Sequence, residues 1–205
     1  SAGLINAPKD WSGTTKPAMS FGQAYSVTAM QATSIFATIA NDGVRVEPTV
    51  IAGTSDAQGH YTPAKPRKST RVISAETASK MRLMMESVVS ANGTAPSAAI
   101  PGYRVAGKTG TAQRVVNGRY SGYTASFIGF APADKPRYVI SVTIQAPQGL
   151  HWGGVLGGPV FKEVMSYVLE AKHIPPTNTK VTPIPLNAAE VAALEAAKVK
   201  KEKKA

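Results

Sequence analysis

Several features that mark common protein classes are missing from this chain of 205 residues. There is no cysteine, so disulfides, thiolate metal sites and a thiol nucleophile are excluded. No run of about 18 apolar residues is present and the start does not resemble a signal peptide, so we expect any membrane anchor outside this sequence. No internal repeat is visible. Because 43% of the residues are hydrophobic, the chain can still build a core.

Histidines and acidic residues are also scarce. The three histidines, at positions 60, 151 and 173, are far apart and have no carboxylate cluster around them, so we expect no metal site and no cofactor. The sequence has 12 acidic and 23 basic residues, which gives a net charge of +11. Residues 198–204 hold five lysines and one glutamate, which leaves 11 − 4 = +7 on the rest. That run lacks the aromatic residues of a nucleic-acid site, so a solvated terminus is favoured over an anionic surface or nucleic acid as partner.

Apolar spacing predicts three helices. The first covers residues 26–41 and ends at Asp42-Gly43. The second begins after Ser74, a typical N-cap residue, and ends at Asn92-Gly93. In the third, Pro159 takes the first helical position, and two prolines follow the end of the helix.

Three strands are predicted between the second and third helices, at residues 103–116, 123–131 and 137–145. Asn117-Gly118 is typical of a hairpin turn, and a short proline-bounded turn precedes the last strand. Short connections favour an antiparallel meander, so the predicted fold class is α+β, with an antiparallel sheet flanked by helices. Residues 187–205 have helical propensity but little to bury, and we expect residues 177–205 to form an exposed, mobile tail.

Residues 102–111 match two catalytic motifs with unrelated chemistries. Residues 102–109 fit the phosphate-binding loop, and residues 108–110 fit the Lys-Thr-Gly box of penicillin-interacting serine acyltransferases. A phosphate loop needs a buried strand before it and a helix directly after it. Here two prolines precede the motif, Gly110 stands where the helix should start, and no acidic magnesium ligand follows the best apolar run. We therefore place Lys108 on a strand.

A set of segments in a fixed order points to one family. The segments are Ser20-Phe21-Gly22-Gln23, Ile39-Ala40-Asn41-Asp42-Gly43, Met84-Met85-Glu86-Ser87-Val88-Val89, Gly102 to Ala112, Phe127 to Pro132, and Gly153-Gly154 to Pro159. In this order they resemble the C-terminal half of a penicillin-binding transpeptidase domain, closest to the class B enzymes of cell division and elongation. The resemblance implies that residues 1–176 are the C-terminal part of such a domain.

What the resemblance implies is a serine acyl transfer on the D-alanyl-D-alanine end of a peptidoglycan stem peptide, inhibited by β-lactams. Lys108, Thr109 and Thr111 would offer one ammonium and two hydroxyls to the terminal carboxylate. Gly110 would let a substrate backbone approach along the strand edge. By the same resemblance, Lys108 biases the proton network of the site, and the backbone N–H of Thr111 is one of two oxyanion donors. Strict alternation puts Lys108 and Thr109 on opposite faces, so local twist or backbone contact must contribute.

Two other boxes of that family are missing. A Ser-x-x-Lys box occurs nowhere, and residues 77–80, Thr-Ala-Ser-Lys, only imitate it. A Ser-x-Asn match at residues 90–92 stands at a helix end, where asparagine and glycine are ordinary terminators. We therefore expect this chain alone to be inactive and to need the N-terminal half of the same domain. The resemblance also places the intact enzyme on the outer face of the bacterial cytoplasmic membrane, with division or elongation membrane proteins as further partners.

Other interpretations stay open. A D,D-carboxypeptidase, a β-lactamase or a β-lactam-sensing domain of the same superfamily would share the Lys-Thr-Gly box, since the residues around the nucleophile separate these activities. A non-catalytic module that uses the basic tail on an anionic polymer or membrane is a different class of answer. A nucleotide-binding protein with a phosphate loop is the most remote one.

Overall fold

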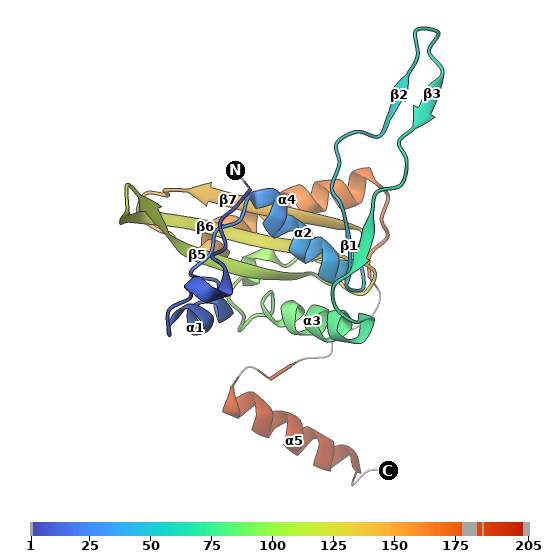
Figure 1. Ribbon diagram of the computed structural model, residues 1–205. Helices are drawn as coiled ribbons and strands as arrows, with labels where there is room; N and C mark the ends of the chain where they lie inside the picture. The colour runs from blue at the N-terminus through green and yellow to red at the C-terminus, as the bar shows by residue number, and fades with distance from the viewer. Residues whose placement is uncertain (1, 178–183, 186, 203–205) are drawn as a thin grey trace.

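The computed structural model describes residues 2–177, 184–185 and 187–202 (Figure 1). Its helices are α1 (Thr15–Ser20), α2 (Ala29–Ala40), α3 (Ala75–Ser87), α4 (Gly153–Ala171) and α5 (Ala188–Glu202), with short 3-10 helices η1 (Pro8–Asp10) and η2 (Pro96–Ala98). Its strands are β1 (Val44–Val46), β2 (Gly53–Ser55), β3 (Tyr61–Pro63), β4 (Ser69–Arg71), β5 (Ala106–Val116), β6 (Arg119–Ala131) and β7 (Tyr138–Gln145).

β5, β6 and β7 form one antiparallel sheet in that order, which confirms the predicted meander. Asn117 and Gly118, between β5 and β6, have φ values of 51° and 74°. A tight hairpin turn of type I′ needs positive φ at both central residues, so the predicted turn is confirmed. In this register Lys108 of β5 lies opposite Ile128 of β6.

Helices cover both faces of the sheet, which confirms the α+β class (Figure 1). On one face Phe127 meets Phe161 of α4 edge to face, with ring centroids 5.0 Å apart. On the other face Phe130 belongs to a cluster with Ile39 of α2. Phe127 and Phe130 are both fully buried, and their odd spacing on β6 sends them to opposite faces. A slip of one residue would exchange the two faces, so burial on both sides fixes the register.

Capping side chains set the starts of α2 and α3. Thr28 and Gln31 form a capping box, in which each side chain accepts the backbone N–H of the other at 3.1 and 2.8 Å. Ser74 Oγ accepts the N–H of Thr77 at 3.0 Å, so the predicted N-cap of α3 is confirmed.

α4 begins earlier than the sequence predicts. It starts at Gly153, so Pro159 lies inside the helix, and the prediction that Pro159 opens it is wrong. Glycine weakens a helix by about 1 kcal/mol relative to alanine, yet the first two turns contain four buried glycines, Gly153, Gly154, Gly157 and Gly158. Close packing compensates: a Cβ at Gly153 would lie 2.2 Å from the carbonyl oxygen of Ser126 on β6. The missing side chains therefore let the helix touch the sheet backbone.

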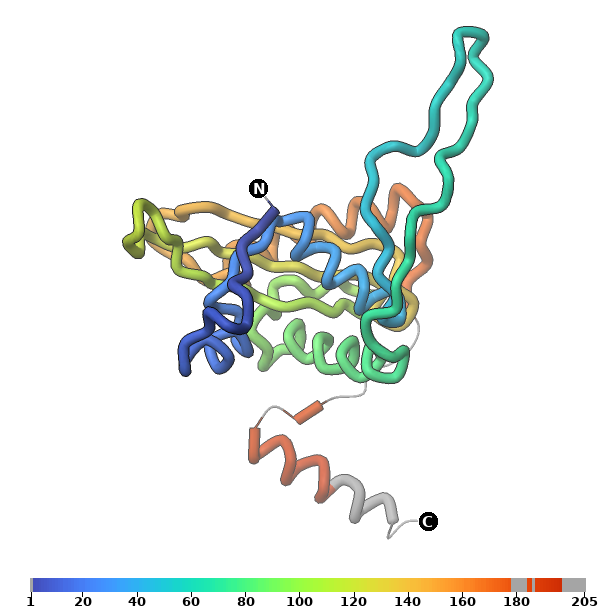
Figure 2. Tube along the Cα trace, in the orientation of Figure 1, coloured from blue at the N-terminus to red at the C-terminus, as the bar shows by residue number. Residues whose placement is uncertain are grey.

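Two short antiparallel ribbons between α2 and α3 were not predicted from the sequence. β1 pairs with β4, and β2 pairs with β3. Each strand has three residues, which is too few for a clear period-two pattern. The β2–β3 ribbon projects away from the sheet and its helices (Figures 1 and 2).

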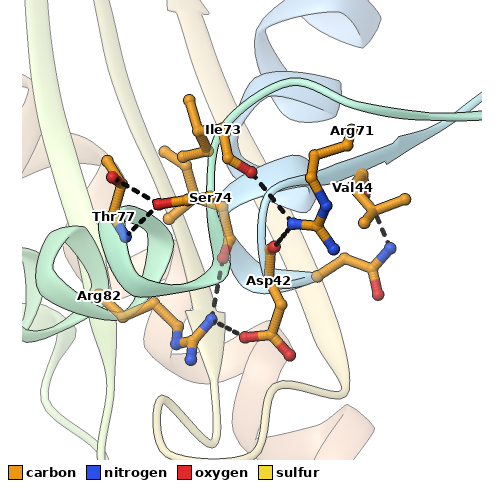
Figure 3. Close-up of polar contacts among 9 residues, drawn as sticks. Asp42, Val44, Arg71, Ile73, Ser74, Thr77 and Arg82 are labelled. Carbon is orange, nitrogen blue, oxygen red and sulfur yellow. Dashed lines mark hydrogen bonds and ion pairs between the residues drawn. The ribbon is translucent and has the colours of Figure 1, made fainter.

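A polar network anchors the base of this projection to the helices (Figure 3). Arg71 Nη1, from β4, donates to the carbonyl oxygens of Asp42 and Ile73 at 2.9 and 3.1 Å. Arg82 Nη1, from α3, donates to the Asp42 carboxylate at 2.7 Å and to the Ile39 carbonyl oxygen at 3.1 Å. The turn after α2 is thereby tied to both β4 and α3.

The C-terminal segment lies beside the end of α3. Asn92 Nδ2 donates to Glu190 Oε1 of α5 at 2.6 Å, and a cavity of about 610 Å³ lies between α5 and the body. The predicted helical propensity is confirmed by α5. The domain boundary after residue 176 and the mobility of the tail stay predictions, and residues 178–183, 186 and 203–205 lie outside the described part of the chain.

Candidate active site

The four predicted site residues, Lys108, Thr109, Gly110 and Thr111, lie together near the start of β5. β5 is the edge of the three-stranded sheet within the described residues, so one side of its backbone faces no neighbouring strand there. Lys108 is exposed, and the other three are half-buried. Lys108 is in the interior of the strand and no helix follows it, which removes the structural context that a phosphate loop requires.

The Lys108 side chain bends back over this edge. Its Nζ atom donates to the carbonyl oxygen of Thr109 at 3.0 Å and to Thr109 Oγ1 at 3.3 Å. Alternation along the strand would separate the two side chains, and the length of the lysine overcomes that separation. The ammonium and the hydroxyl therefore converge at one place.

Thr109 and Thr111 are held by the segments that pack beside β5. Thr109 Oγ1 lies 3.2 Å from Thr94 Oγ1, within hydrogen-bonding distance. Thr111 Oγ1 accepts the backbone N–H of Gly153, the first residue of α4, at 3.2 Å. The positive end of the α4 dipole is thereby directed at the same edge.

Gly110 packs closely against the neighbouring strand. A Cβ at this position would lie 2.5 Å from Ser126 Oγ, on the facing residue of β6. Ser126 occupies the space that a side chain at position 110 would need. The glycine of the box thus has a packing role that the sequence did not indicate.

An aromatic stack borders the site where α4 begins. The His151 ring stacks on Tyr123 of β6, with centroids 4.1 Å apart and planes 10° apart. Trp152, the N-cap of α4, lies beside His151 with centroids 4.9 Å apart and is 57% exposed. Tyr123 was missed as a site neighbour, because nothing in the sequence links it to the distant His151.

A buried ion pair, which no sequence motif marks, supports the start of β5. Arg104 donates from Nε and Nη2 to the two oxygens of Glu86 at 2.8 and 2.6 Å. The Glu86 side chain is only 2% exposed. The hydrogen bonds to Glu86 raise the pKa of Arg104, with a further contribution from the carboxylate charge. This pair fixes the chain two residues before β5.

The two imitation boxes serve local structure. In residues 77–80, Thr77 Oγ1 accepts a hydrogen bond from the hydroxyl of the N-cap residue Ser74. Lys80 forms an ion pair with Glu76 at 2.6 Å on an exposed helix face. In residues 90–92, Ser90 Oγ donates to the Ser87 carbonyl oxygen, and Asn92 contacts α5 as described above. Each group therefore has a structural partner outside the Lys-Thr-Gly box.

Neither a cluster of metal-ligating side chains nor a membrane-spanning helix is found in the described ranges. Across residues 2–177 and the described tail, no cluster of three or more metal-ligating side chains occurs. In the same part of the chain, no helix has the length and apolarity to cross a membrane.

The chain is similar to known cell-wall enzymes over most of its length. Residues 1–166 match the family model for the penicillin binding protein transpeptidase domain. Penicillin-binding protein PbpB of Mycolicibacterium smegmatis is 40% identical over 200 residues, which are 92% of this chain and 31% of that protein. The probable peptidoglycan D,D-transpeptidase PenA of Neisseria flavescens is 37% identical over 90% of this chain and 45% of its own length.

A solved structure agrees with these sequence matches. Penicillin binding protein 3 from Mycobacterium tuberculosis, crystallised with ampicillin, superposes with a TM-score of 0.84 at 37% identity. The match covers 92% of this chain and 44% of that one. The chain thus spans less than half the length of these relatives. With a family model covering residues 1–166 and relatives of this identity, the chain belongs to the penicillin-binding protein transpeptidase domain family.

Proposed function

We propose that this chain forms the Lys-Thr-Gly side of the active site of a peptidoglycan D,D-transpeptidase, a serine acyltransferase inhibited by β-lactams. The observation that carries the proposal is the convergence of the Lys108 ammonium and the Thr109 hydroxyl at the outer edge of β5, 3.3 Å apart. Similarity to a protein named as a probable D,D-transpeptidase supports the same reaction.

A terminal carboxylate fits this edge chemically. Lys108 is exposed, so its ammonium can exchange the contact with the Thr109 carbonyl oxygen for a substrate carboxylate. Hydrogen bonds from a charged donor to a carboxylate are roughly twice as strong as neutral ones. The N-terminus of α4, which reaches Thr111 through Gly153, adds positive potential.

The backbone of Thr111 is suited to hold the oxyanion. The Thr109 carbonyl oxygen accepts a hydrogen bond from the Lys108 ammonium, which indicates that this carbonyl lies on the outer side of β5. Backbone groups of alternate residues point to the same side of a strand, so the N–H of Thr111 is on that side too. A preorganised N–H there would stabilise the charge that develops on a substrate carbonyl oxygen.

The nucleophile belongs to a part of the protein outside these 205 residues, which contain no Ser-x-x-Lys box. In the proposed reaction, the serine Oγ forms an ester with the penultimate D-alanine, and the C–N bond to the terminal D-alanine breaks. The serine proton passes to the leaving amine. An amine of a neighbouring stem peptide then attacks the ester, forms the crosslink and returns a proton to the serine.

The setting of the enzyme follows from this reaction. Peptidoglycan lies outside the cytoplasmic membrane, so we place the intact enzyme on the outer face of that membrane, with stem peptides and β-lactams as ligands. Residues 1–176 would be the C-terminal part of its transpeptidase domain. Membrane proteins of division or elongation are the proposed recruiting partners.

Labelling with a fluorescent penicillin tests the proposal. The full-length gene product that contains this chain should form a covalent adduct, and the 205-residue chain alone should not. Lys108→Ala should slow acylation of the full-length protein by about 100-fold. Lys80→Ala, in the exposed imitation box, is the matched control and should label normally. A stoichiometric adduct on the chain alone, or normal labelling of Lys108→Ala, would contradict the proposal.

A further inference from the structure

Residues 47–68, which include β2 and β3, form a projecting hairpin that we call the arm (Figures 1 and 2). Apart from Gly53 and Ala64, every arm residue is exposed. The two strands pair only with each other among the described residues, so both outer edges of the ribbon are open there. A two-stranded ribbon without a core is marginally stable in water, so the arm needs other support.

Local contacts preform the arm. At its tip, Asp56 Oδ1 accepts the backbone N–H groups of Gln58 and His60 at 3.0 and 2.9 Å. In the ribbon, Tyr61 lies over Gly53, because a Cβ on this glycine would meet the tyrosine ring at 2.5 Å. The ribbon is therefore presented in a defined shape, which lowers the entropy cost of binding along it.

Apolar side chains on the arm are unusually open. Val50 is 95% exposed, Ile51 is 55% exposed and Tyr61 is 57% exposed. Val50 and Ile51 are neighbours in the chain, and contiguous exposed apolar residues mark interaction sites more often than isolated ones do. Among the described residues, nothing buries these three side chains.

Positive charge borders this apolar group. Lys65, Arg67 and Lys68 are all exposed on the returning leg of the arm. Arg67 Nη2 donates to Thr49 Oγ1 at 2.9 Å, which brings its guanidinium beside Val50. A ligand that covers Val50 therefore meets a cation at the same time.

We propose that the arm docks a second protein through an extended segment of that protein in which acidic and aliphatic side chains alternate. The segment lies in extended form along the outgoing leg of the arm, from the open edge of β2 back past Ile51 and Val50, in the manner of strand addition. Its carboxylates meet Lys65, Arg67 and Lys68, and its aliphatic side chains cover Val50 and Ile51. This docking is independent of the acyl transfer proposed above.

Fluorescence anisotropy with designed peptides tests the proposal. The labelled probe has four Glu-Val repeats, and the comparison probes have four Glu-Ser or four Lys-Val repeats. The full-length gene product should bind Glu-Val at least about tenfold more tightly than either comparison peptide, with affinity falling as salt rises. Val50→Asp and Arg67→Glu should each weaken Glu-Val binding by about tenfold.

A matched control variant tests whether binding is specific to the arm. Tyr120, 71% exposed near the β5–β6 turn, is a second open aromatic on a hairpin, and Tyr120→Asp should leave binding unchanged. The melting temperatures of all variants should equal that of the parent, because these side chains are exposed. Equal binding of Glu-Ser, full competition by polyphosphate, unchanged binding by Val50→Asp, or no binding of any peptide would each overturn the proposal.

Discussion

β5 and the arm both present an open strand edge among the described residues, but β5 rests on a core and the arm does not. Phe127, the residue of β6 that is paired with Thr109, is completely buried, whereas nearly all of the arm is exposed. Each element also has a carboxylate with a basic partner nearby. Glu86 pairs with Arg104 just before β5, and Asp56 pairs with His60 at the tip of the arm. Chemistry needs side chains held to within a fraction of an ångström, so packing suits β5 for catalysis and the arm for contact.

Breaking the buried pair should give the largest effect. Glu86→Ala removes the carboxylate that binds Arg104, whose side chain is only 18% exposed. We expect a loss of about 3 kcal/mol in the free energy of unfolding, measured by urea titration. Glu76→Ala breaks the pair with Lys80, which is 70% exposed, and should cost less than about 1 kcal/mol. Equal losses in the two variants would remove the distinction between a supported and an unsupported element.

Separating α4 from the sheet should give the next largest effect. In Gly153→Ala, the new Cβ would lie 2.3 Å from the Gly110 carbonyl oxygen, on the backbone of the site itself. We expect about 1–3 kcal/mol of destabilisation and slower acylation by fluorescent penicillin. Gly13→Ala is the control, because a Cβ there meets nothing within 4 Å. Normal acylation by Gly153→Ala would show that β5 does not need the α4 contact.

The contrast between local contacts and contacts of distant segments explains which features could be predicted from the sequence. The hairpin at Asn117-Gly118 and the cap at Ser74 depend on neighbours in sequence, and both are confirmed. The start of α4 at Gly153 depends on contact with a distant strand, which local helix propensity cannot show. The Glu86–Arg104 pair likewise joins α3 to the segment before β5, with no motif to mark it. The catalytic box was found because its chemistry is contiguous in the chain.

Removing most of the arm should have a small effect on the body. We expect that replacing residues 50–63 with a Gly-Ser-Gly-Ser linker changes the free energy of unfolding by less than about 1 kcal/mol, since loop-closure entropy varies slowly with loop length. Acylation by fluorescent penicillin should be unchanged. Urea titration and labelling of the full-length gene product measure both. A loss as large as that of Glu86→Ala would mean that the arm supports the fold.

Acid should loosen only the tip of the arm, the smallest effect of the four. Hydrogen bonds from the backbone and side chain of His60 hold the pKa of Asp56 below its ordinary value of 3.8. A carboxyl group with a depressed folded-state pKa stabilises structure above its unfolded-state pKa and loses that contribution as the pH falls through the lowered value. The amide signals of Gln58 and His60 in NMR spectra should therefore shift together below about pH 4, while those of β5 stay in place. In Asp56→Asn the shared transition should disappear. A transition that moved β5 at the same pH would show that the arm and the core are coupled.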